Sequence, residues 1–310
     1  MNSMDNPFIL FDEKISISNV KTFIRKINNI FSIQYLQKNG MKFSLWKTKE
    51  IDFISIVILY KFLEYSVVKK CFYKPTIYLS YEVKKTIKFY KFHSIVTALI
   101  EGNDIKDEFD NLKIEIKDDF IIAPIALSQE KVITNEQWNK MLLPNIMQYY
   151  HDDIALMIFQ FFIELYSNFT SHANDETRSI MVAHGTKNWI EIVCIDNGIG
   201  IVNSLRDIFP RMSPNKVLEK AMCKYTTSKS EQGHMGYGLW YINEIVKKIN
   251  GRLEIWSNNA YYKSIGNKTI SMMSPNWQGT ILYIKIPLNK VILLDEIDNI
   301  ESLNEQINFI

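Results

Sequence analysis

The stretch Phe162-Ile163-Glu164-Leu165-Tyr166-Ser167-Asn168-Phe169-Thr170-Ser171-His172 sets three polar residues into a helical apolar pattern. Glu164, Asn168 and His172 are four residues apart, so an α-helix carries them on one face. Apolar residues from Ala155 onward predict that this helix is buried and about 20 residues long. A carboxylate, an amide and an imidazole are costly to bury without partners. The pattern predicts a ligand-binding stripe, although three exposed polar residues on an amphipathic helix would give the same spacing.

Two glycine motifs follow in the same half of the chain. Asp196-Asn197-Gly198-Ile199-Gly200 comes directly after the apolar run Ile190–Ile195, a predicted strand. Its glycines permit a tight turn, and a buried Asp196 can accept a hydrogen bond from an exocyclic amine such as adenine N6. Gly233-His234-Met235-Gly236-Tyr237-Gly238-Leu239 opens a predicted helix, and helix N-termini favour phosphate. An ordinary strand exit and a flexible glycine loop are the alternatives.

Between these motifs, Ile201–Lys229 has short helical patterns and polar turns, which predict a mobile segment. Its last residues include Thr226, Thr227 and Lys229, whose hydroxyls and ammonium group can add phosphate contacts. No Gly-Lys-Ser/Thr sequence follows the glycines, so the motif is not a Walker P-loop.

Taken together, the three motifs resemble the ATP-binding module shared by gyrase, the heat-shock chaperone, histidine kinases and mismatch-repair proteins, the GHKL superfamily. Their order matches, and a predicted strand pair, Ser179–Ala183 and Trp189–Ile195, separates the first two. The resemblance covers about residues 150–288. It implies a Bergerat-type α/β sandwich in which helices back a mixed sheet, with ATP and Mg²⁺ as ligands.

The resemblance also implies roles by position. Glu164 is the general-base candidate and Asn168 the Mg²⁺ ligand. Asp196 would bind adenine, with Gly198 and Gly200 shaping its turn. The further positions expected to contact the nucleotide are His172, Thr226, Thr227, Lys229, Gly233, Gly236, Tyr237, Gly238 and Leu239. One departure is Ser171, which stands where a lysine is common and leaves one phosphate or ribose contact unfilled.

The first hundred residues alternate predicted strands and helices. The strands are expected at Phe8–Phe11, Lys42–Trp46 and Thr76–Ser80, and the helices at about 20–31, 56–68, 82–90 and 94–100. This alternation predicts parallel strands with crossover helices. Ile51-Asp52-Phe53-Ile54-Ser55 and the helix after it resemble the small sulfate-transporter-and-anti-sigma-antagonist (STAS) domains.

In the regulatory STAS members a Ser or Thr shortly after the Asp takes a phosphate. Aligning on Asp52 places Ile54 at that position, with Ser55 one residue late. The resemblance therefore implies a scaffold or docking role, and a generic α/β cap without chemistry is the alternative.

Composition breaks divide the chain into four predicted parts. Pro124, Pro144 and the polar stretch Ser128–Asn139 suggest a connector between domains. The expected parts are a STAS-like regulatory or docking domain at 1–125, the connector at 126–150, the ATP-binding domain at 151–288 and an acidic helical tail at 289–310. A polar loop, Asn258–Gln278, is expected between the last two strands.

The composition, net charge and cysteine content argue against several classes of protein. Of the 310 residues 47% are hydrophobic and 23% charged, which permits a packed core. The net charge of +2 does not indicate nucleic acid. Three cysteines without ligand spacing favour a reducing compartment. The sequence shows no signal peptide and no apolar run long enough to span a membrane, so we expect a cytoplasmic protein that does not associate with a membrane.

Three functions fit these observations. The first is a slow ATPase that acts as a nucleotide-dependent switch for a protein partner, or for a homodimer formed through the N-terminal domain. The second is a protein kinase similar to the anti-sigma kinases, in which Glu164 activates a hydroxyl on a separate partner. The third is a nucleotide-binding interaction module without catalysis. His93 lacks the acidic and basic neighbours of a phosphoacceptor histidine.

Overall fold

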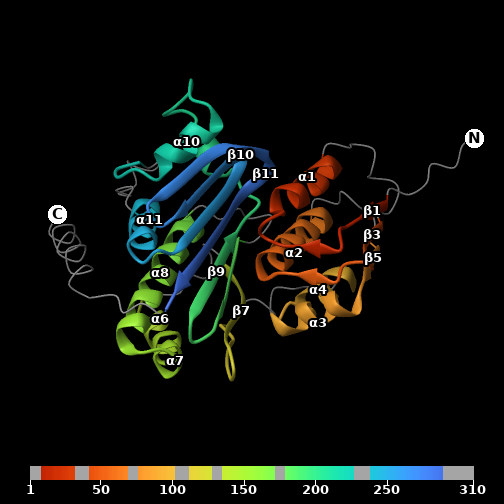
Figure 1. The fold of residues 1–310 in the computed structure, drawn as a ribbon, viewed down its shortest axis with the longest axis horizontal. Coiled ribbons are helices and arrows are strands. Elements are labelled where there is room, and N and C mark those ends of the chain that lie inside the picture. Colours follow the sequence, from red (N-terminus) through yellow and green to blue (C-terminus); the bar gives the residue numbers. More distant parts are fainter. Residues whose placement is uncertain are drawn as a thin grey trace, which may run out of the picture.

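The computed structural model describes residues 8–31, 42–68, 76–101, 112–127, 135–171, 179–226 and 238–288. These residues form a mixed α/β structure whose largest sheet separates two layers of helices (Figure 1). The predicted fold class, an α/β sandwich, is confirmed. The predicted acidic tail lies outside the described residues.

The N-terminal layer holds a three-stranded parallel sheet in the order β1-β3-β5 and a short parallel pair, β2-β4. Its elements are β1 (Phe8–Leu10), β2 (Lys14–Ile15), α1 (Val20–Phe31), β3 (Lys42–Leu45), β4 (Glu50–Ile51), α2 (Phe53–Val68), β5 (Thr76–Leu79), α3 (Tyr81–Phe89) and α4 (His93–Glu101). The predicted parallel pairing and crossover helices are therefore present.

Helix α2 carries apolar residues around most of its circumference, because nearly all of its side chains are buried. Its residues pack into one hydrophobic cluster that also contains residues of α1, α3 and the large sheet. Asp52 starts the helix: its Oδ1 accepts a hydrogen bond from the Ser55 N–H (3.1 Å), and its Oδ2 accepts one from the Ile17 N–H (2.6 Å). One carboxylate thus caps α2 and ties it to the segment before α1.

The large sheet has six strands in the order β10-β11-β9-β8-β7-β6, and all neighbouring strands are antiparallel. The resemblance implied a mixed sheet, and in this respect the prediction is wrong. Its elements and the helices around it are β6 (Ile114–Ile116), β7 (Phe120–Leu127), α6 (Asn135–Met141), α7 (Leu143–Tyr149), α8 (Asp152–Ser171), β8 (Ser179–Gly185), β9 (Trp189–Ile195), α9 (Ile201–Ser204), α10 (Pro214–Ala221), α11 (Gly238–Lys248), β10 (Arg252–Ile265) and β11 (Lys268–Pro287).

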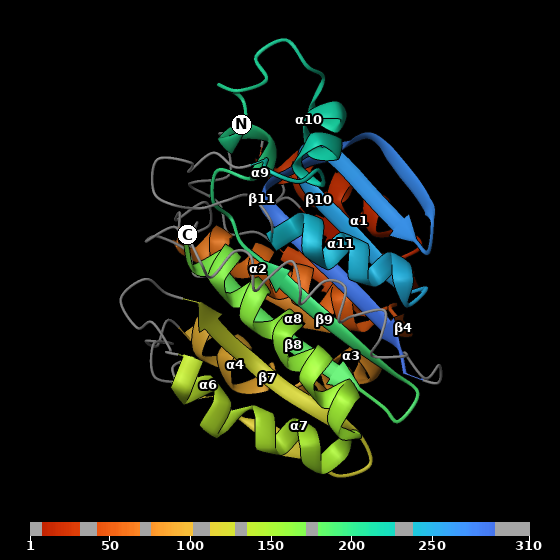
Figure 2. The same ribbon diagram turned by 90° about the vertical axis from the view of Figure 1, so that its left-hand side faces the viewer.

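Both faces of this sheet are covered, which explains why its central strands are apolar at successive positions. On β9, Ile192 and Cys194 pack with α8 and α11, whereas Val193 and Ile195 pack with the N-terminal layer. Figure 2 shows α8 and α11 crossing one face, with the N-terminal helices behind the sheet. We call these the helix face and the rear face.

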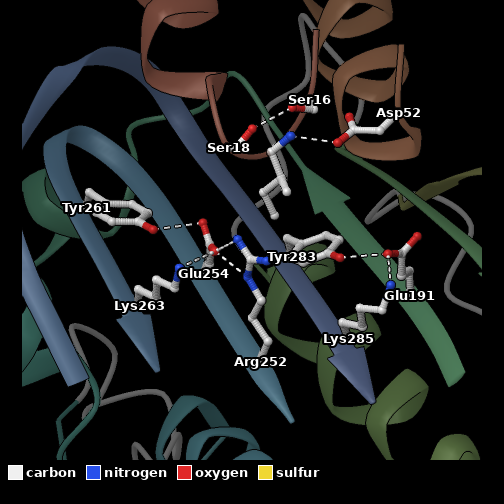
Figure 3. A network of polar contacts seen from close by, with 11 residues as sticks. Ser16, Ser18, Asp52, Glu191, Arg252, Glu254, Tyr261, Lys263, Tyr283 and Lys285 are labelled. Carbon is white, nitrogen blue, oxygen red and sulfur yellow. Dashed lines mark hydrogen bonds and ion pairs between the residues drawn. The ribbon is translucent and has the colours of Figure 1, made fainter. Parts of the chain in front are cut away.

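The rear face also carries paired charges (Figure 3). Glu254, 1% exposed, accepts hydrogen bonds from Arg252 and from the Tyr261 hydroxyl (2.8 Å). Glu191 accepts bonds from the Tyr283 hydroxyl (2.7 Å) and from Lys285 (2.8 Å). These two glutamate carboxylates between the layers are therefore hydrogen-bonded, as burial requires.

Two parts of the structure differ from the sequence-based expectation. The predicted boundary region is not a linker: β7 pairs with β8, and α6 and α7 bury Trp138 and Ile146 in the core of the helix face. Pro124 misled the prediction because it lies at a register shift of β7, where a strand tolerates proline. The predicted polar loop Asn258–Gln278 is instead the outer part of the β10–β11 hairpin, which turns at Gly266 and Asn267.

Candidate nucleotide site

Helix α8 carries the first predicted motif along one side. Phe161, Phe162 and Leu165 are buried in the core and fix the rotation of the helix. Glu164 is half-buried, and burial raises the pKa of its carboxyl above the usual value. A carboxyl with a raised pKa is better suited to accept a proton near neutral pH. The raised pKa is compatible with the general-base role that the sequence predicts for Glu164.

Asn168 brings α8 against the start of α11. A Cβ atom placed on Gly238 would lie 2.5 Å from Asn168 Nδ2 and 2.9 Å from its Oδ1, closer than such atoms pack. A larger residue at position 238 would force the Asn168 side chain to move away from this contact. The amide of Asn168 thus lies beside the N-terminal turn of α11, whose first N–H groups have no partner within the helix. The first and third sequence motifs meet here.

The second motif lies where β9 ends. Asp196 is 7% exposed, and its Oδ1 accepts a hydrogen bond from the Gly198 N–H (2.6 Å). Its own N–H donates to the Thr280 carbonyl (2.9 Å), and its carbonyl accepts from Trp277 Nε1 (3.0 Å). Burial raises the pKa of the Asp196 carboxyl to about 6, opposed by the Gly198 bond and the charge of Lys61. The turn holds a carboxylate rigidly in a largely dry environment.

Residues that the sequence analysis missed complete this turn. Gly279 has φ +99°, and a Cβ there would lie 2.3 Å from the Asp196 carbonyl oxygen. Gly200 has φ +78° and fits against Asn258, whose side chain donates to the Ile199 carbonyl (3.0 Å). Because Asn258 was expected in a polar loop and Gly279 at the first position of the strand after it, their roles were hidden. The signal that would have found the hairpin is the dipeptide Gly266-Asn267, which is typical of two-residue hairpin turns.

The segment that begins at Ile201 follows this turn. Helices α9 and α10 are short, as predicted, and α10 packs on the β10–β11 hairpin, where Ser271 Oγ donates to the Asn215 carbonyl (2.8 Å). The Lys224 ammonium lies 4.8 Å from the centre of the Trp240 ring on α11. Thr226 is half-buried at the end of this segment, and Leu239 packs against the core.

Several predicted positions lie outside the described residues, so their arrangement stays a prediction. They are His172, Thr227, Lys229, Gly233, Gly236 and Tyr237.

A metal ion at this site would depend on few protein ligands. Among the described residues, no group of three or more His, Cys, Asp or Glu side chains is placed to hold a metal. Mg²⁺ commonly keeps several waters and takes one or two protein oxygens together with phosphate. The amide oxygen of Asn168, close to the half-buried Glu164, fits that kind of site.

The comparison with known families agrees with this geometry. Residues 153–290 match the family of histidine kinase-, DNA gyrase B-, and HSP90-like ATPases. This segment is an ATPase domain of that type. The match covers α8, the Asp196 turn, α11 and the final hairpin, and it supports ATP binding by the domain. A search of the curated proteins finds no match to the chain.

The ATPase domain does not account for the whole chain. The match begins at residue 153, although β6, β7, α6 and α7 belong to the same sheet and core. The resemblance of the N-terminal layer to STAS domains stays a prediction. In the described part of the chain, no helix has the length and apolarity needed to cross a membrane.

Proposed function

We propose that the ATPase domain binds Mg²⁺-ATP and hydrolyses it slowly, as a conformational switch for a protein partner. The observation that carries this proposal is the contact of Asn168 with Gly238. It joins the helix that bears the candidate base Glu164 to the helix end suited for phosphate. The family match to residues 153–290 supports the same ligand.

In this proposal the Asp196 carboxylate recognises adenine. The carboxylate is buried and held by the Gly198 N–H, so it can accept a hydrogen bond from the adenine amino group without competition from bulk water. The turn is fixed by Gly200 and Gly279, which allow close packing around it. Such a fixed acceptor selects a base with a donor at this position.

The phosphates would lie at the N-terminus of α11. Gly238 and Leu239 open this helix, and its first N–H groups and dipole favour negative charge. Thr226 and the undescribed positions Thr227, Lys229, Gly233, Gly236 and Tyr237 are proposed to close the site. Asn168 would hold Mg²⁺ through its amide oxygen, and the ion, when bound, neutralises phosphate charge.

Glu164 would orient a water and accept its proton. Its raised pKa suits it for this role, and its partial exposure leaves a path for the water. The same exposure favours a second function, a protein kinase in which Glu164 accepts the proton of a hydroxyl on a partner.

Labelled ATP and Mg²⁺ separate these functions. Free labelled phosphate supports the ATPase, and label on an added partner protein supports the kinase. Glu164→Ala is expected to lower turnover about 100-fold or more, because general-base catalysis contributes at least this much. ATP binding, measured by calorimetry, should persist.

A matched control is Asp153→Ala, which removes an exposed carboxylate from the start of the same helix. It should leave turnover unchanged. If Glu164→Ala turns over ATP as fast as this control, Glu164 is not the base. If the unaltered protein binds no ATP, the proposed function is wrong.

A further inference from the structure

Trp277 contacts both the N-terminal layer and the Asp196 turn. Its side chain is 1% exposed and lies in the hydrophobic cluster that joins α1 and α2 to the rear face of the sheet. Its indole N–H donates to the main-chain carbonyl of Asp196 at 3.0 Å. The carbonyl of the proposed adenine-binding residue is therefore held by a side chain that packs with the N-terminal layer.

The neighbouring residue makes a second connection. Tyr65 on α2 donates its hydroxyl to Gln278 Oε1 (3.4 Å), across 213 positions of sequence. The main-chain carbonyl of Gln278 accepts a hydrogen bond from Asn197 Nδ2 (3.2 Å). Gly279 then packs directly on Asp196. The short segment 277–279 thus contacts α2 on one side and the Asp196 turn on the other.

Helix α2 also places a charge near this turn. Lys61 is 0% exposed and forms an ion pair with Glu64, which also accepts a hydrogen bond from the Tyr60 hydroxyl (3.2 Å). The charge of Lys61 lowers the pKa of Asp196 and so opposes the effect of burial. A buried ion pair is costly to form and contributes little net stability. The geometric link between α2 and the turn remains the segment 277–279, and the Lys61 charge acts on the same carboxyl from the same helix.

We propose that α2 is an internal regulator of the nucleotide site: its packing on the rear face holds the Asp196 turn in the arrangement that accepts adenine. This inference rests on the proposed role of Asp196. ATP binding and the docking of α2 then stabilise each other, because coupling between two sites is reciprocal. A protein that displaces α2 would release ATP, and ATP would resist that displacement.

Calorimetry of the full chain with Mg²⁺-ATP tests this. The double variant Lys61→Met/Glu64→Leu removes both charges together and keeps an apolar helix, so folding should survive. We expect its Kd for ATP to rise about fivefold or more, the lower range of measured couplings. Tyr65→Phe removes only one hydroxyl and should raise Kd less. The matched controls Lys84→Met and Tyr81→Phe alter exposed residues of α3 and should bind as the unaltered protein does.

Hydrogen exchange measures the reverse direction. Saturating Mg²⁺-ATP should slow amide exchange in peptides from α2 of the unaltered protein, and not in Asp196→Asn. If the unaltered protein binds no ATP, both the proposed function and this inference are wrong. A different result refutes the coupling and leaves the proposed function standing. In that case the unaltered protein binds ATP, Lys61→Met/Glu64→Leu and Tyr65→Phe bind it with the same Kd, and ATP does not slow amide exchange in α2. Tyr65→Phe alone decides the affinity test if the double variant does not fold.

Discussion

The two faces of the six-stranded sheet handle polar residues differently. On the rear face, Glu254 and Glu191 are buried or nearly so, and each is bonded to a cation and a tyrosine hydroxyl (Figure 3). At the site on the helix face, the pKa values of Glu164 and Asp196 are raised, because burial acts on both carboxyls more strongly than their partners do. The contrast agrees with the structural role of the paired carboxylates and with the ligand-binding roles proposed for Glu164 and Asp196.

The largest effect is expected on stability, when a substitution breaks the hydrogen-bond network of the rear face. Glu254→Ala should lower the free energy of unfolding by about 3 kcal/mol, because it leaves Arg252 and the Tyr261 hydroxyl without their buried acceptor. Urea unfolding followed by circular dichroism measures this. The matched variant Glu136→Ala breaks an exposed pair with Lys140 and should cost less than about 1 kcal/mol. Equal losses in both variants would show that the buried network has no special role.

A smaller effect is expected at the site. Asp196→Asn should weaken ATP binding about 30-fold, about 2 kcal/mol, because a hydrogen bond to a charged acceptor becomes a neutral one. The same change should not reduce the free energy of unfolding, since it relieves a buried charge. Calorimetry and urea unfolding check the two statements. The exposed Asp207→Asn serves as the control, and an Asp196→Asn affinity equal to that of the control would exclude the adenine role.

The smallest effect is a pH dependence with opposite signs for binding and folding. The pKa of Asp196 is raised from 3.8 to about 6, so below pH 6 the carboxyl is protonated and ATP affinity should fall up to about tenfold per pH unit.

Stability should change the other way. The native state takes up this proton more readily than the unfolded chain does, so the Asp196 contribution to stability rises as pH falls from about 6 to about 4. The measurement is the difference between the unaltered protein and Asp196→Asn at each pH, which cancels other carboxyls. A difference that does not vary with pH would contradict the raised pKa.

Much of the fold could be predicted because the decisive patterns are local. The apolar period of α8, the strand pair β8–β9 and the start of α11 at Gly238 all lie within short windows. The β10–β11 hairpin escaped prediction because its outer strands carry serines, asparagines and lysines. The structure supports these residues by packing α1 and α10 against the two sides of the hairpin, which no local pattern records.

The sequence by itself determined the order of the three motifs and the helices and strands that carry Glu164, Asn168 and Asp196. Only the tertiary structure decided that the N-terminal layer covers the rear face of the ATPase sheet. It alone also showed that Trp277 bonds to Asp196 across 81 residues and that Tyr65 reaches Gln278 across 213. The physical reason is that backbone periodicity is set by near neighbours, whereas a contact between distant segments depends on how whole layers pack.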